Sequence, residues 1–157
     1  MVLTVPKVTV AFEKVADPYL LDKVSKNDLF ELRLILELGM ANVLFVRKNE
    51  ADLDLLEEII EKEARAENEM ERILCDVEFH SILYKMTGNK TLIKFQKLLL
   101  PVFEHVVEYE GEHGISDRGT VSHPDLLDIL RNGSPEEFRE AMAKHLEPHL
   151  NHIKAAQ

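Results

Sequence analysis

Apolar residues recur every three or four positions along most of this chain, which is the spacing of amphipathic helices. From residue 25 onward the pattern is nearly continuous, and short polar segments with glycine or proline interrupt it. Residues 1–24 differ, because the stretch LTVPKVTVAF alternates and is rich in β-branched residues. The pattern predicts an extended leader or linker arm over residues 1–24. It predicts an all-α antiparallel bundle over residues 25–157.

The first helix is predicted over residues 25–49, where Ser25 and Asp28 have the spacing of a capping box. Its expected apolar stripe consists of Leu29, Leu32, Ile35 or Leu36, Met40, Val43 and Val46. Further helices are predicted over residues 50–67, 69–86, 90–110, 122–133 and 134–153. Capping boxes are predicted at Ser122 with Asp125 and at Ser134 with Glu137, and Pro101 should divide the helix that contains it.

Composition narrows the class of protein. The 157 residues are enough for one domain with its own core. A net charge of −10 argues against direct binding of a nucleic acid backbone. The single cysteine excludes an intrachain disulfide, and no apolar run is long enough to span a membrane. The amino-terminal residues lack the layout of a signal peptide, so we expect a cytoplasmic protein.

The stretch DVEFH places a carboxylate and an imidazole four residues apart inside an apolar helix. Asp76 and His80 share one helical face, so both can reach one metal ion such as zinc, nickel, manganese or iron. The alternative is an ordinary ion pair on the protein surface.

Two further histidines strengthen the metal hypothesis. His123 lies in the first turn of one predicted helix, and His145 lies on the apolar stripe of the next. If these helices meet the helix that carries Asp76 and His80, the four side chains converge. Each histidine can instead be a hydrogen-bonded core residue. His149, one turn after His145, is an alternative ligand, whereas His105, His113 and His152 are expected at the surface.

Arg33 stands among leucines and isoleucine, which is unusual for a guanidinium. It can anchor a carboxylate ligand, pair with Glu37 one turn later, or extend to solvent. No sequence motif of a nucleophilic enzyme is present. Core packing is expected for Cys75. Glu78 is the nearest candidate for a general base, and it should point away from the face of Asp76 and His80.

Together these segments resemble a known family. DVEFHSILYKMTGN is similar to the D-x-x-F-H…G-N segment of the FCD domain, the ligand-binding domain of the FadR subfamily of GntR-type transcription regulators. LFELRLILELGMANVLFVRKN resembles its first helix, with Arg33 and Glu37. SHPDLLDILRNGSPEEFREAMAKHL resembles its closing segment, with His123 and His145. The resemblance covers residues 26 to about 153.

The resemblance implies an antiparallel bundle of six or seven helices that binds a divalent metal, zinc or nickel, through Asp76, His80, His123 and His145. It implies a small carboxylic or sugar acid as effector, with Arg33 as its anchor, and a homodimer. The family's winged-helix domain is absent from this chain, so DNA contact is expected only through such a domain. An excised domain and a stand-alone sensor both remain open.

Two other functions are kept as alternatives. One is a helical-bundle metalloenzyme, either a metal-dependent hydrolase or an oxygenase, in which the metal activates water. The other is a structural or adaptor domain without a ligand, whose stability would not depend on metal. The leading hypothesis is an effector-binding and dimerisation domain rather than an enzyme.

Overall fold

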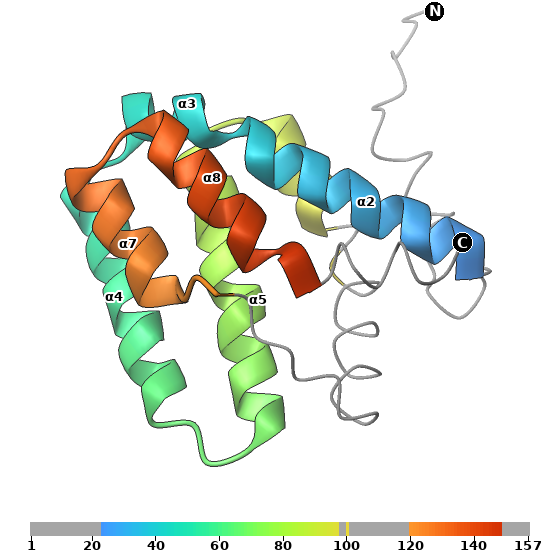
Figure 1. The fold of residues 1–157 in the computed structure, drawn as a ribbon, viewed down its shortest axis with the longest axis horizontal. Coiled ribbons are helices and arrows are strands. Elements are labelled where there is room, and N and C mark those ends of the chain that lie inside the picture. The colour runs from blue at the N-terminus through green and yellow to red at the C-terminus, as the bar shows by residue number, and fades with distance from the viewer. Residues whose placement is uncertain (1–22, 98–99, 101–119, 149–157) are drawn as a thin grey trace, which may run out of the picture.

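The computed structural model describes residues 23–97, 100 and 120–148 (Figure 1). Their helices are α2 (Lys23–Gly39), α3 (Ala41–Arg47), α4 (Glu50–Ala64), α5 (Glu69–Met86), α7 (His123–Asn132) and α8 (Pro135–His145). Residues 90–97 are helical as well, and the described residues contain no strand. The predicted all-α class is therefore confirmed. The leader arm, apart from residues 23 and 24, and Pro101 lie outside the described residues.

Polar caps set several of the helix boundaries. Ser122 and Ser134 each begin a helix through a complete capping box, as the sequence predicts. α5 ends where Gly88 adopts a positive φ of 61°, a conformation that favours glycine. Asn49 caps α4 and Asn68 caps α5 through their side-chain oxygens, so both helices begin directly after an asparagine.

The helices pack in antiparallel neighbours. α4 and α5 form a hairpin, and α7 packs against α4 on one side and α8 on the other (Figure 1). α8 also contacts α2 and α3. A core of leucine, phenylalanine and methionine side chains lies between them, including Leu44, Leu56, Phe79, Leu83, Leu126, Leu130, Phe138 and Met142, all fully buried. This arrangement brings the start of α7 and the end of α8 to the middle of α5.

The first predicted helix differs from the structure in three ways. α2 already begins at Lys23, so Ser25 lies inside the helix and its predicted role as a cap is wrong. The single helix predicted over residues 25–49 is two helices, separated at Met40 directly after Gly39. Glycine has a low helix propensity, which is consistent with a break at this point.

The apolar stripe predicted for this segment is also wrong in part. Ile35, Val43 and Val46 are 61%, 40% and 84% exposed. The face that is buried instead carries Arg33, Leu34, Glu37, Met40, Ala41 and Leu44. Hydrophobic periodicity assigned the wrong face because a paired arginine and glutamate occupy two of the buried positions.

None of the described helices combines the length and the apolar character that crossing a membrane requires.

Candidate metal centre

Three helices position the four residues that the sequence predicts as metal ligands. Asp76 and His80 lie one turn apart on α5. His123 is the first residue of α7, and His145 is the last residue of α8. α7 and α8 are antiparallel and are joined by only two residues, so the start of α7 lies beside the end of α8. The ring centroids of His123 and His145 are therefore only 4.8 Å apart.

The structure brings these four side chains to one point. One candidate ligand atom from each residue lies within 4.8 Å of the others. Nε2 of His123 is 3.3 Å from Oδ1 of Asp76, and Nε2 of His80 is 3.6 Å from the same oxygen. Nε2 of His80 is also 3.2 Å from Nε2 of His145. The predicted convergence in space is therefore observed, while metal binding itself stays a prediction.

The second nitrogen of each ring faces an acceptor outside the cluster. Nδ1 of His123 is 2.8 Å from Oε2 of Glu63, and Nδ1 of His145 is 2.9 Å from the carbonyl oxygen of Val121. Nδ1 of His80 is 2.8 Å from Oε2 of Glu37, although the contact is poorly aligned for a hydrogen bond. These acceptors favour protonation of Nδ1, which leaves the lone pair of each Nε2 directed at the centre.

The donor atoms of this cluster are arranged in a way that suits a bound cation. Two unprotonated Nε2 atoms at 3.2 Å repel each other unless a proton or metal ion lies between or beside them. Nε2 of His123 is buried without a hydrogen-bond partner. Three imidazole nitrogens and one carboxylate oxygen form a donor set that suits zinc, nickel and related divalent ions.

The charges in the cluster are strongly coupled. Burial would raise the pKa of Asp76, but the imidazoles of His80 and His123 hold it well below its ordinary value. Burial would lower the pKa of His123, but the carboxylates of Asp76 and Glu63 raise it to about 9. Burial, together with the charges of His80 and His123, lowers the pKa of His145 to about 3. Without metal, His123 is therefore a positively charged imidazolium at neutral pH, with a proton on each ring nitrogen.

Arg33 and Glu37 form a buried ion pair beside this cluster. Their exposed fractions are 3% and 0%, and Nε of Arg33 is 2.6 Å from Oε1 of Glu37. Burial would raise the pKa of Glu37, but Arg33 and His80 lower it to about 2. The guanidinium also lies 3.9 Å from Oδ2 of Asp76. The ion pair with Glu37, which the sequence suggested as one alternative role of Arg33, is therefore present.

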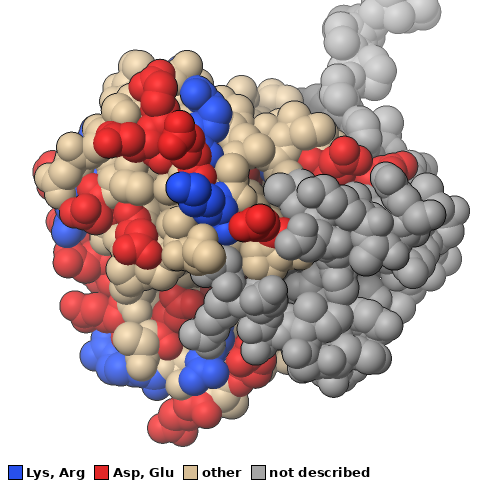
Figure 2. Space-filling model, viewed as in Figure 1, with Lys and Arg blue, Asp and Glu red and all other residues tan. Residues whose placement is uncertain are grey.

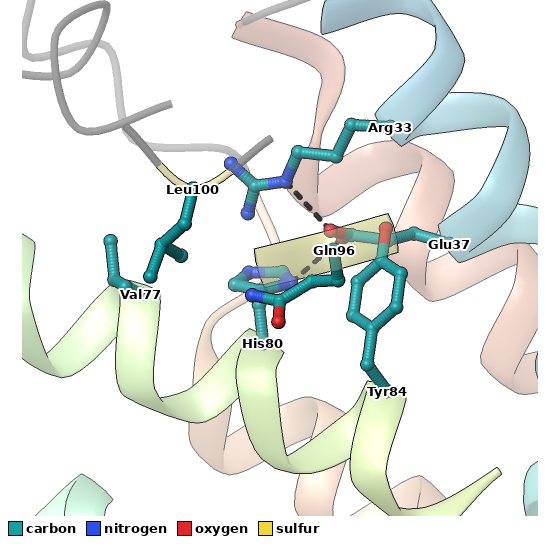
Figure 3. Close-up of a pocket in the computed structure, with 7 residues that line it drawn as sticks. All are labelled: Arg33, Glu37, Val77, His80, Tyr84, Gln96 and Leu100. Atoms are coloured by element: carbon teal, nitrogen blue, oxygen red, sulfur yellow. Dashed lines mark hydrogen bonds and ion pairs between the residues drawn. The ribbon is translucent and has the colours of Figure 1, made fainter. Parts of the chain in front are cut away.

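A small cavity lies on the side of His80 that faces Glu37 (Figure 3). Its lining consists of Arg33, Glu37, Val77, His80, Tyr84, Gln96 and Leu100. The hydroxyl of Tyr84 is buried without a hydrogen-bond partner and points towards Glu37 (Figure 3). Gln96 donates a hydrogen bond to Ser81 at the same wall. The space left is about that of one water molecule, about 10 Å³.

The remaining candidates from the sequence lie elsewhere. Glu78 is half exposed and forms an ion pair with Lys62 at 2.8 Å, so it points away from the cluster as expected. Cys75 is fully buried in the core, and burial raises the pKa of its thiol. His149, the alternative to His145, lies outside the described residues, as do His105, His113 and His152. Sequence reasoning missed Glu63, Val121, Tyr84 and Gln96, which carry no distinctive local motif.

Comparisons with known proteins identify the family of this chain. No curated protein matches the chain. Among solved structures, a GntR protein of Streptococcus agalactiae is similar, with a TM-score of 0.65 and 25% sequence identity. The match covers 85% of this chain but 63% of the streptococcal chain, so this protein spans less than two thirds of that relative. The family model of the FCD domain matches residues 28–148, and the chain therefore belongs to the FCD domain family.

Proposed function

We propose that this domain binds a divalent metal ion through Asp76, His80, His123 and His145 and acts as the sensory domain of a GntR-type transcription regulator. The observation that carries the proposal is the arrangement of the three imidazoles. Nε2 of His80 and Nε2 of His123 lie 3.6 Å and 3.3 Å from Oδ1 of Asp76, and Nε2 of His145 lies 3.2 Å from Nε2 of His80. Each Nδ1 faces an acceptor outside the cluster. A core histidine that only has to form its own hydrogen bonds does not require two other histidines and a carboxylate beside it.

Charge supports the same proposal. Asp76, Glu37 and Glu63 carry three negative charges, and Arg33 carries one positive charge. A divalent ion would displace the extra proton of His123 and leave all three imidazoles neutral, and the remaining formal charge of −2 is the one that such an ion neutralises. Zinc or nickel suits the donor set, and a bound ion would supply a Lewis acid to which an oxygen ligand can bind.

The effector in this proposal is a small carboxylic or sugar acid. Arg33 borders both the metal cluster and the cavity, and its guanidinium would pair with the carboxylate of an acid. The cavity has room for about one water molecule, so the side chains around it would have to move apart to admit the acid. Tyr84 and Gln96 add hydrogen-bonding groups to the same wall. Glu37 already holds Arg33, so an incoming anion has to compete with Glu37 for the guanidinium.

That competition provides a route to regulation. Arg33 and Glu37 belong to α2, whereas His80 belongs to α5. Arg33 also contacts Asp76 of α5, and Glu37 contacts His80 of α5. An effector that weakened these contacts would change how α2 is held against α5, and one that favours a particular arrangement shifts the population of states. In a homodimer this shift would alter the spacing of attached DNA-binding domains.

Contact with DNA is proposed to occur only through a winged-helix domain outside this chain, in a cytoplasmic regulator. The net charge is −10, and acidic side chains are spread over the face shown in Figure 2. Such a surface repels phosphates. The metalloenzyme alternative loses its candidate base, because Glu78 pairs with Lys62 on the surface.

Elemental analysis tests the metal site. The domain, purified without a histidine tag, should contain about one equivalent of zinc or nickel. An Asp76→Ala, His80→Ala double variant should contain none, and Glu78→Ala on the same helix should match the parent. If the folded parent takes up no ion after reconstitution with zinc or nickel, the proposal fails.

A thermal-shift screen with acetate, lactate and gluconate tests the effector. An acid that binds as proposed should raise the Tm of the metal-loaded parent and leave the double variant unchanged. Equal shifts in both proteins would show that the acid binds away from the metal.

A further inference from the structure

Glu63 occupies a distinctive place beside the metal cluster. It lies in the last turn of α4, a helix that contributes none of the four candidate ligands. Its side chain is 28% exposed, yet Oε2 lies 2.8 Å from Nδ1 of His123, whose own side chain is 5% exposed. The two residues are 60 positions apart in the sequence, so tertiary packing alone brings them together.

Two contacts together fix the orientation of His123. Phe79 stacks on the imidazole, with ring centroids 4.2 Å apart and an angle of 26° between the planes. Stacking fixes the plane of the ring but allows it to flip or rotate within that plane. The hydrogen bond to Glu63 removes this freedom, because Nδ1 must then face α4. Nε2 is left facing Oδ1 of Asp76 at 3.3 Å.

The same contact selects the form of His123 that can bind a metal. A carboxylate accepts and cannot donate, so Nδ1 must carry the proton that it shares with Glu63. Nε2 is then the nitrogen that gives up its proton to an incoming ion and binds it through the lone pair, and the negative charge of Glu63 makes that lone pair a stronger donor. His145 obtains the corresponding hydrogen bond from the main chain at Val121, which no side-chain substitution removes.

We propose that Glu63 is a positioning residue of the metal centre, which holds His123 with Nε2 directed at the ion and strengthens it as a ligand. This inference rests on the proposed metal site and goes beyond its four ligands. The rival explanation is a purely structural ion pair between α4 and α7. The two differ in outcome, because a structural pair would change the stability of the metal-free domain and leave metal affinity unchanged.

The test compares the parent domain with Glu63→Gln, and uses Glu58→Gln, an exposed residue of the same helix, as the matched control. Zinc affinity is measured by competition with a chromophoric chelator, below the Tm of each metal-free protein. Glu63→Gln should weaken zinc binding by about 10–100-fold. The visible spectrum of bound cobalt should also change, because the orientation of one ligand changes. Glu58→Gln should match the parent in both measurements.

Several results would overturn the inference. Parental zinc affinity and an unchanged cobalt spectrum in Glu63→Gln would reduce Glu63 to a structural role. If this variant does not fold, NMR of the zinc-loaded parent decides, because His123 should show a protonated Nδ1 and a metal-bound Nε2. The opposite assignment would refute the proposed role. A parent that binds no zinc would instead refute the metal site itself, which is a distinguishable result.

Discussion

Replacing Glu37 with leucine should destabilise the metal-free domain by about 3–5 kcal/mol, because it leaves the guanidinium of Arg33 buried without its main partner. Both side chains are almost fully buried, and the contact between them is 2.6 Å. Replacing both residues, as Arg33→Met with Glu37→Leu, removes the two charges together. The double variant should therefore lose far less stability than the single one.

The titration of Glu37 gives a second measure of the same interaction. Its pKa is lowered from 4.5 to about 2, which corresponds to roughly 3 kcal/mol at neutral pH. Because the folded value is the lower one, this stabilisation is complete above about pH 4.5 and is lost as the pH falls towards 2. The parent should lose stability over this acidic window, and Glu37→Leu should lose less.

Urea unfolding followed by far-UV circular dichroism measures these effects. A chelator in every sample removes any contribution of metal, since Glu37 also contacts His80. Glu57→Leu is the control, because Glu57 pairs with Arg131 at the surface and its loss should cause no resolvable change. The reasoning is refuted if Glu37→Leu costs less than about 1 kcal/mol, or if the double variant is less stable than the single one.

Three further predictions concern metal, protons and backbone conformation. Free metal at a thousandfold excess over Kd should stabilise the domain by ~4 kcal/mol. Chelation should therefore lower Tm by about 8–16 °C in differential scanning calorimetry, and an unchanged Tm would favour a domain without a metal. Zinc binding at pH 8 should release a proton, because the pKa of His123 is raised to about 9 without metal. Calorimetry in two buffers of different ionisation enthalpy measures this release, and identical heats would contradict it. Gly88→Ala should cost ~1–2 kcal/mol in urea unfolding, because φ is 61°. Gly39→Ala, which has open space for a Cβ and no positive φ, should be neutral or stabilising.

Local chemistry made part of the fold predictable. Ser122 with Asp125 and Ser134 with Glu137 form capping boxes, whose hydrogen bonds span only three residues. Such interactions depend little on the rest of the molecule. The same signal failed at Ser25, because the helix continues to Lys23. A capping motif is therefore informative only where no helical residues precede it.

The buried face of α2 and α3 depended on tertiary structure. A stripe through Val43 and Val46 is as regular in the sequence as one through Leu34 and Leu44, but the former is exposed. The correct face includes Arg33 and Glu37, which are tolerated inside because each compensates the charge of the other and because Asp76 and His80 lie beside them. Hydrophobicity cannot indicate such a pair before the contacts of both residues are known.

The sequence offered His123 and His145 as further ligands only if their helices met the helix of Asp76 and His80, with His149 as an alternative to His145. By itself, it determined the all-α class, the ends of several helices and the shared face of Asp76 and His80. These features follow from short-range spacing, such as the single turn between Asp76 and His80. Tertiary structure alone decided that α5, α7 and α8 meet, and that Glu37, Glu63 and the carbonyl of Val121 orient the imidazoles. The physical reason is that an imidazole becomes a directed ligand only when its second nitrogen has a partner, and here each partner lies 24 or more residues away along the chain.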